Sequence, residues 1–383
     1  MTDIQHGAQW AATWTLLVVL VAIGCRSQTE PASPTPADPA PVVSSPADNP
    51  AVLPSQTPPL PRPTATPVPS PSPTPPVLHQ LTSGGCCTQP FWSPDSRRVL
   101  FIDRPAPDVP VGIWGVDVTR PNPTPELVTE RIAFYTADMT LLVELSEDTT
   151  VIERLADGAR WTVPAGGRPV SISPGQKRIA WQVTDESLPF ERQITQVWVA
   201  SLDGTDARQV ATLPRGGFGG WISEDVLLLS GRVSLESREQ VLYAFSLTSG
   251  DTTGLIQAER LRGGLLSPDG AWLACYVALD PDPSQNGLWL VRTDGSERRQ
   301  LDRDLFGAYQ WRDAERLLII PFRPQAVSHE FWEVDVSTGE ARRLTDPTIT
   351  PFKVANGDWT VSPDGRHVAF VESRDHNIWL LTL

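Results

Sequence analysis

The sequence predicts an all-β fold, a seven-bladed β-propeller of four-stranded antiparallel blades, over residues 78–383 of the 383-residue chain. Two recurring signals carry this prediction: a polar turn followed by a short apolar strand, and an aromatic-centred strand about 20 residues further on. Dividing 306 residues (383 minus 77) by seven gives about 44 residues for each unit, the length expected of a propeller blade. Hairpins follow one another with no helix-period segment between them, which excludes a parallel α/β fold.

The turn signal appears six times. Proline presets φ at the first central position of a turn, aspartate or serine bonds the local backbone, and glycine takes a positive φ. The six copies are Trp92-Ser-Pro-Asp-Ser96, Ser173-Pro-Gly-Gln176, Trp221-Ile-Ser-Glu-Asp225, Ser267-Pro-Asp-Gly270, Trp311-Arg-Asp-Ala314 and Ser362-Pro-Asp-Gly365. The strands that follow them are residues 99–102, 178–181, 226–229, 271–274, 317–320 and 367–370.

The second signal is a strand centred on an aromatic residue: Trp114, Trp198, Tyr243, Trp289, Trp332 and Trp379. Most of these strands then meet a glycine turn and a further strand, as at Asp203-Gly204 and Asp294-Gly295. Asp-Gly between alternating strands is a strong hairpin signal. A gap of 80 residues separates the first two Ser-Pro turns, and we place one degenerate unit there, at residues 137–158.

The two ends of the domain predict how the ring closes. The seventh unit ends at its aromatic strand, Ile378-Trp-Leu-Leu-Thr-Leu383, with no strand after it. Val77-Leu-His-Gln-Leu-Thr82 matches the last strand of a unit, as at Ala341-Arg-Arg-Leu-Thr345. We therefore expect the N-terminal strand to complete the last blade and to cover its open edge.

Residues 1–24 have the pattern of a signal peptide. The apolar run of 14 residues from Ala11 to Gly24 is short for a membrane span, which needs about 20, but suits a signal-peptide h-region. The run ends in Ala22-Ile-Gly-Cys25, which resembles the lipobox of bacterial lipoproteins. The resemblance implies cleavage before Cys25, acylation of its sulfur, and an extracytoplasmic, lipid-anchored protein of the cell envelope. An uncleaved anchor or a mis-set start codon is the alternative interpretation.

Residues 25–77 predict a disordered spacer. Eighteen of the 39 prolines lie between Pro31 and Pro76, and most of the other residues there are Ser, Thr, Ala and Val. This composition cannot form a core and favours extended polyproline II, at about 3.1 Å per residue. The spacer could therefore hold the domain as much as ~150 Å from its anchor.

The Trp-Ser-Pro-Asp turn, with its apolar strand and its Ile-Trp strand, is similar to the repeat of TolB-type β-propellers, which also occurs in the propellers of prolyl oligopeptidases. The resemblance covers nearly all of residues 78–383. It implies the fold, and a role in binding proteins or peptides or in shielding another domain. The sequence contains no Gly-x-Ser-x-Gly nucleophile motif, so we do not expect the hydrolase chemistry of the peptidases.

The domain carries 29 basic and 41 acidic side chains, a net charge of −12. This charge argues against nucleic acid or an anionic lipid surface as partner, so we expect membrane contact through the lipid anchor only. Its four histidines, His79, His329, His367 and His376, are scattered without ligand spacing. We therefore expect no metal and no cofactor, and we expect a monomer. Ser267-Pro-Asp-Gly-Ala-Trp272 approaches the sialidase turn but lacks its threonine, and we interpret it as structural.

Cys86 and Cys87 are adjacent in a loop where the chain enters the first blade. An extracytoplasmic compartment permits disulfides, and adjacent cysteines can form a vicinal ring. Two free thiols, or one of the pair bonded to Cys275, are the alternatives, because sequence cannot fix connectivity. Cys275 lies between Trp272 and Tyr276 in an apolar strand, which predicts a buried thiol.

The longest loops join the apolar strand to the aromatic strand of each unit, and we expect them to gather on one face of the ring. Ordinary solvated loops would have the same composition. We predict a non-enzymatic protein- or peptide-binding or scaffolding module; the alternative is a propeller hydrolase or lyase that acts on glycans or another extracellular polymer through carboxylates at the channel face. The candidate contact residues are Arg104, Asp108, Phe190, Arg192, Asp280, Asp282, Arg323 and His329.

Mass spectrometry of the mature N-terminus tests lipidation at Cys25. In a bacterial host the wild-type chain should begin at an acylated Cys25, because the lipobox directs both reactions to that residue. The Cys25→Ser variant should carry no lipid. A wild-type chain that retains an unmodified Met1 would rule the lipoprotein hypothesis out.

Overall fold

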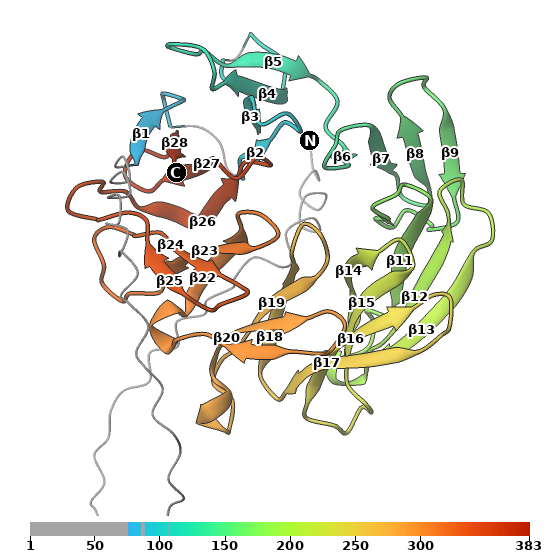
Figure 1. Ribbon diagram of the computed structural model, residues 1–383. Helices are drawn as coiled ribbons and strands as arrows, with labels where there is room; N and C mark the ends of the chain where they lie inside the picture. The colour runs from blue at the N-terminus through green and yellow to red at the C-terminus, as the bar shows by residue number, and fades with distance from the viewer. Residues whose placement is uncertain (1–75, 86–88, 107) are drawn as a thin grey trace, which may run out of the picture. The chain divides into compact units, whose positions relative to one another are not determined.

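The computed structural model describes residues 76–85, 89–106 and 108–383, which form seven four-stranded antiparallel sheets arranged in a ring (Figure 1). The predicted all-β, seven-bladed propeller is confirmed. Three short 3-10 helices, η1 (Phe190–Arg192), η2 (Pro283–Gln285) and η3 (Arg303–Leu305), lie in connections between strands. Cys25, Cys86 and Cys87 lie outside the described residues, so the predictions for them stay predictions.

The sheets follow one another along the chain, and each blade runs from its innermost strand outward. Blades 1 to 3 contain β2 (Phe91–Trp92), β3 (Arg98–Asp103), β4 (Gly112–Asp117) and β5 (Glu126–Thr129); β6 (Phe134–Tyr135), β7 (Leu141–Leu145), β8 (Thr150–Arg154) and β9 (Arg160–Val163); and β10 (Ser171–Ile172), β11 (Arg178–Thr184), β12 (Ile194–Ser201) and β13 (Arg208–Pro214). Blades 4 and 5 contain β14 (Gly217–Ser223), β15 (Val226–Gly231), β16 (Gln240–Ser246) and β17 (Thr252–Ala258); and β18 (Leu261–Leu266), β19 (Trp272–Val277), β20 (Gly287–Arg292) and β21 (Arg298–Gln300). Blades 6 and 7 contain β22 (Gly307–Trp311), β23 (Arg316–Pro321), β24 (Trp332–Asp335) and β25 (Ala341–Arg343); and β26 (Val354–Val361), β27 (His367–Glu372), β28 (Ile378–Thr382) and β1 (Val77–Gln80).

The recurring Ser-Pro turn joins the first and second strands of a blade. In blade 5, the Ser267 hydroxyl donates to the Asp269 carboxylate (2.6 Å) and accepts from the Trp272 backbone N–H (2.9 Å). The last position of the turn needs a positive φ, which glycine supplies without strain. That position is occupied by Ser96 (φ 59°), Met139 (54°), Gln176 (54°), Gly270 (72°) and Gly365 (69°).

Apolar side chains fill the spaces between neighbouring blades. Leu242 of blade 4 and Val277 of blade 5 belong to one buried cluster, and Leu290 of blade 5 packs with Leu317 of blade 6 in the next. Similar clusters join blades 2 and 3, 3 and 4, 6 and 7, and 7 and 1. Both faces of the sheets of blades 3 to 7 are therefore covered, which explains why their strands are nearly continuous apolar runs in the sequence.

Tryptophans at the ends of inner strands tie neighbouring blades together. The indole Nε1 of Trp311 in blade 6 donates to the Leu265 carbonyl of blade 5 at 2.9 Å. Trp221 donates in the same way to Ser171, and Trp92 to Thr360, at 3.1 and 3.3 Å. An indole fills the space between blades and also satisfies a backbone acceptor of its neighbour.

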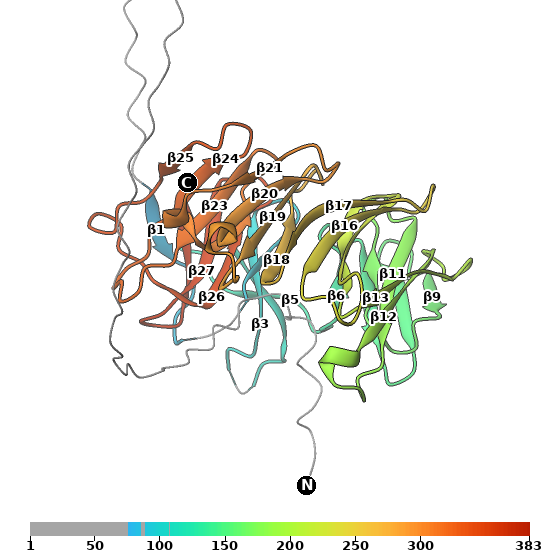
Figure 2. The ribbon, with the colours of Figure 1, turned by 90° about the horizontal axis from the view of Figure 1, so that it is seen from below.

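The N-terminal strand closes the ring, as predicted. In Figure 1 the blue strand β1 lies beside the red strand β28, and the two pair in antiparallel register from Val77 with Thr382 to Gln80 with Trp379. The contact extends beyond the strand, because the Ile378 N–H donates to the Thr82 hydroxyl at 2.9 Å. Figure 2 shows the sheets of blades 5 and 6 side by side, farther along the ring.

The Thr82→Val variant tests the importance of this closure. Valine keeps the shape but leaves the Ile378 N–H buried without an acceptor, which should lower the free energy of unfolding by about 1–3 kcal/mol. Thr252→Val, at an exposed position of β17, is the matched control and should change little. Urea denaturation of the three proteins measures the difference, and equal stabilities would contradict the closure role.

Candidate functional site

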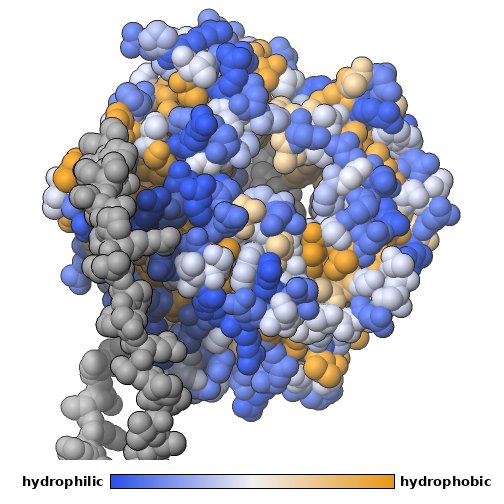
Figure 3. Space-filling view, in the orientation of Figure 1, coloured by the Kyte–Doolittle hydropathy of each residue, from blue (hydrophilic) through white to orange (hydrophobic). Residues whose placement is uncertain are grey.

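One face of the ring carries two kinds of connection: the loops between the second and third strands of each blade, and the crossovers between blades. Consecutive antiparallel strands place both kinds at the same ends of the sheets. We call this surface the loop face. Its connections are hydrogen-bonded to one another, as from the Arg215 N–H to the Gln193 carbonyl and from the Arg232 N–H to the Pro214 carbonyl, both 2.9 Å. Figure 3 shows that the surface of the ring is hollowed near its centre.

Two of the predicted residues, Asp280 and Asp282, lie together on this face. The Asp280 carboxylate accepts from the backbone N–H groups of Asp282 (3.0 Å) and Arg260 (3.1 Å). Asp282 caps η2, and the hydroxyl and N–H of Ser284 hold the pKa of its carboxyl below the usual range. We call the cavity of about 470 Å³ beside them the acidic pocket, lined by Glu239, Gln257, Ala258, Glu259, Asp280, Pro281, Asp282, Gln285 and Arg298.

Four other predicted residues lie on blades 1 and 3. Phe190 is 57% exposed, and the Arg215 guanidinium carbon lies 5.0 Å from the centre of its ring. Arg192 is exposed in the same helical turn. Arg104 and Asp108 are exposed in the loop of blade 1, where the Arg104 Nε donates to the Val109 carbonyl at 3.2 Å. Blades 1 and 3 are not neighbours in the ring, so these residues belong to separate parts of the loop face.

The last two predicted residues, Arg323 and His329, share the loop of blade 6. Arg323 is exposed, whereas His329 packs edge-on against Phe352 of the next crossover. The His329 Nδ1 accepts from the Val354 N–H at 3.2 Å. Burial, reinforced by the charge of Lys353, lowers the pKa of His329. His329 is therefore a neutral residue that fastens the loop of blade 6 to blade 7.

The structure also brings together four arginines that were not among the residues predicted from the sequence. We call them the arginine cluster: Arg215, Arg232, Arg260 and Arg262. Arg215 lies in the crossover to blade 4, and Arg232 directly follows β15. Arg260 and Arg262 lie in the crossover to blade 5 and at the start of β18.

The arginine cluster concentrates positive charge. Burial lowers the pKa of Arg232, and the charges of Arg215, Arg262 and Arg260 lower it further against the opposing charge of Glu259. The Nε atoms of Arg215 and Arg232 are buried without a hydrogen-bond partner. Among the described residues, none of the four arginines forms an ion pair. Such a group attracts an anion, because a negative charge offsets the repulsion among neighbouring guanidinium groups.

The predicted contact residues lie in loops within blades, whereas Arg215 and Arg260 lie in crossovers between blades. The available signal was a pair of segments, Pro214-Arg215-Gly216 and Glu259-Arg260-Leu261-Arg262, which place arginines at two consecutive junctions between blades. The structure adds an observation that the sequence could not give. Arg215 has a φ of 50°, which is uncommon for a residue other than glycine.

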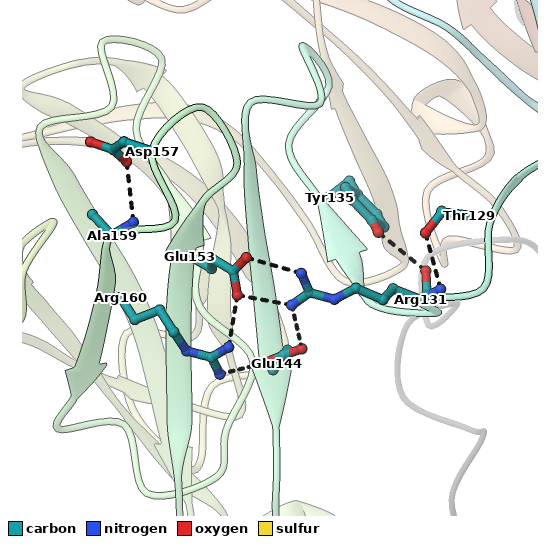
Figure 4. Close-up of polar contacts among 8 residues, drawn as sticks. All are labelled: Thr129, Arg131, Tyr135, Glu144, Glu153, Asp157, Ala159 and Arg160. Atoms are coloured by element: carbon teal, nitrogen blue, oxygen red, sulfur yellow. Dashed lines mark hydrogen bonds and ion pairs between the residues drawn. The ribbon is translucent and has the colours of Figure 1, made fainter.

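A pair of carboxylates, Glu144 and Glu153, lies on blade 2, where it could suggest acid–base chemistry (Figure 4). Arg131 and Arg160 each contact both carboxylates, at distances of 2.6–2.9 Å. Arg131 in particular holds the pKa of both glutamates below the usual range. Since both carboxylates are ionised and fully paired, they form an ion-pair network and not an acid–base pair.

The described part of the chain contains no cluster of three or more His, Cys, Asp or Glu side chains arranged to hold a metal ion. None of its helices has the length and apolar character needed to cross a membrane. Cys275 is a free, fully buried thiol, as predicted, and burial raises its pKa to about 12.

No family model matches the sequence, and no curated protein matches it. Solved structures do match in fold. An oligogalacturonate lyase in complex with manganese is 14% identical with a TM-score of 0.56, and the match covers 80% of this chain and 93% of that one. The oligogalacturonate lyase of Vibrio parahaemolyticus is 10% identical with a TM-score of 0.53 and the same coverage.

TolB from Acinetobacter baumannii is also among the similar structures, at 12% identity and a TM-score of 0.40, with 74% of this chain and 79% of that chain covered. Identities this low describe the fold alone. The chain is a seven-bladed β-propeller whose blades are built on the repeat and the turn chemistry found in the sequence.

His329 should make stability depend on pH. Its pKa in the folded state lies below the ordinary value of 6.5, so the unfolded chain binds the proton more readily and stability falls as the pH drops below about 6.5. In His329→Asn the amide oxygen can accept from the Val354 N–H without titrating. Urea denaturation at pH 7 and pH 5.5 should show a smaller loss for this variant than for the wild type. The exposed control His79→Asn should follow the wild type, and identical losses in all three proteins would contradict the prediction.

Proposed function

We propose that this chain is a non-enzymatic binding module that receives a protein or peptide partner on its loop face. The arginine cluster carries the proposal: it gathers four arginines that form no ion pair within the described residues, two of them exposed, in a domain of net charge −12. A domain that only needed a stable ring would gain by pairing these arginines, as it pairs Arg131 and Arg160. Rigid blades that present polar connections are a common way to build such a binding surface.

The proposal includes a location in the cell. Lipidation at Cys25 would fix the chain to a membrane of the cell envelope, and the proline-rich residues 25–77 would hold the ring away from that surface. The loop face would then meet partners in the extracytoplasmic space. A scaffolding role fits this arrangement, because a tethered ring raises the local concentration of its partner at the membrane.

A propeller lyase acting on an acidic glycan is the second candidate. Two of the similar structures are oligogalacturonate lyases, and arginines pair well with uronate carboxylates. The carboxylate pair that could have acted as acid and base, Glu144 and Glu153, is neutralised by Arg160 of the same blade and by Arg131 of the crossover from blade 1. This neutralisation favours binding over catalysis.

Site-specific photo-crosslinking in cell envelopes tests the binding function. A benzophenone side chain at Val233, which is 77% exposed and adjacent to Arg232, should give a discrete adduct. Adding Arg232→Gln to the same chain should reduce the adduct about tenfold, as expected for loss of one charge-assisted hydrogen bond. The matched control is the same probe at Thr338, in an exposed hairpin on the opposite face.

Adducts from Thr338 but not from Val233 would contradict the proposed face. The purified chain should also release no unsaturated products from oligogalacturonate, measured by ultraviolet absorbance. Formation of such products would reverse the order of the two candidate functions.

A further inference from the structure

We infer that the ligand of the loop face carries opposite charges within a few residues: an acidic group for the arginine cluster and a basic group for the acidic pocket. The expected ligand is therefore a peptide segment in which Asp or Glu lies close to Lys or Arg. This inference rests on the proposed binding function and names the chemistry that it recognises.

The two charged regions are neighbours because one crossover borders both. The chain leaves β17 at Ala258 and enters β18 at Leu261, so only Glu259 and Arg260 lie between the strands. Glu259 lines the acidic pocket, and its charge acts on Arg232 of the arginine cluster. Arg260 belongs to the arginine cluster, and its backbone N–H binds the Asp280 carboxylate of the pocket.

The arginine cluster is prepared for a carboxylate. The Arg215 guanidinium is placed over Phe190, and an Nη of Arg232 donates to the Ser237 carbonyl, so both side chains are held in position. Arg260 and Arg262 beside them are exposed. A guanidinium presents its donors in a planar fork that matches a carboxylate. Bringing in one negative charge would also relieve the repulsion among the four arginines.

The acidic pocket is prepared for a cation. Four carboxylates line it, those of Glu239, Glu259, Asp280 and Asp282, against the single cationic side chain of Arg298. Two of the four carboxylates are fixed by hydrogen bonds to the backbone, so their positions do not depend on a ligand. A volume of about 470 Å³ is within the range of ligand sites and admits a long basic side chain.

This juxtaposition favours a peptide over a polyuronate. A polyuronate repeats the same negative charge, so a chain seated on the arginine cluster would carry its next carboxylates toward Glu259 and Asp280. Like charges placed together in this way cost free energy and exclude wrong ligands. A peptide can alternate its charges and so match both regions.

Fluorescein-labelled Gly-Ser peptides test the inference. One series contains a Glu and a Lys separated by zero to four residues; Glu-Glu, Lys-Lys and Gln-Gln peptides and labelled trigalacturonate are the comparison ligands. Fluorescence anisotropy with the full chain at low ionic strength should show one Glu-Lys spacing that binds at least about tenfold more tightly than Gln-Gln. That peptide should also exceed Glu-Glu and trigalacturonate.

Charge-removing variants assign each half of the ligand to its region. Arg232→Gln should weaken every Glu-containing peptide by about tenfold, whereas Glu259→Gln should weaken only the peptides that contain Lys. Arg366→Gln and Glu340→Gln, exposed on the opposite face, are the matched controls and should bind like the wild type. Thermal melting of each variant verifies that the ring is folded.

Tighter binding of Glu-Glu or trigalacturonate than of every Glu-Lys peptide would overturn the inference, as would equal binding of all peptides. The two proposals fail separately. If the Val233 crosslink forms and depends on Arg232 while no Glu-Lys peptide exceeds Gln-Gln, the binding function stands and the opposite-charge ligand is wrong. If neither result is obtained, both are wrong.

Discussion

The pairing of β1 with β28 is the constraint on which the rest of the ring depends. Six blades are continuous in sequence, but blade 7 contains three strands from one end of the domain and one from the other. Four residue pairs, extended by the bond from Ile378 to Thr82, join these ends. Without them blade 7 would present an open edge, and the apolar clusters on its two sides would lose their common support.

Most of the fold could be predicted from the sequence because each blade repeats the same turn and strand residues. The Ser267 hydroxyl bonds both Asp269 and the backbone of Trp272, so the residues of the motif themselves form the hydrogen bonds of the turn. Closure was predictable for the same reason, since residues 77–82 resemble the outer strand of a blade. Contacts between blades were not predictable, because a sequence does not show that the Trp311 indole reaches the carbonyl of Leu265.

The candidate site could be predicted from the sequence less completely than the fold. Asp280 and Asp282 were predictable as loop residues, and they line the acidic pocket, but their bonds to Arg260 and Ser284 depend on the fold of the loop. Arg215 and Arg232 are 17 positions apart, and they come near each other only because the β14–β15 hairpin returns the chain to the crossover that precedes it. Their importance comes from what they lack, an acidic partner, and an unpaired group is visible only when its surroundings are known.

The position of β1 also has a mechanical consequence. It is the first strand of the described ring, so tension that reaches the ring along the preceding chain is applied to the strand that holds blade 7 closed. Val77, where the strand begins, is paired with Thr382 at the other end of the domain, and the load would separate the pairs one after another from that point. The pairing of β1 with β28 would therefore separate under force before any blade that is formed from a single continuous segment unfolds.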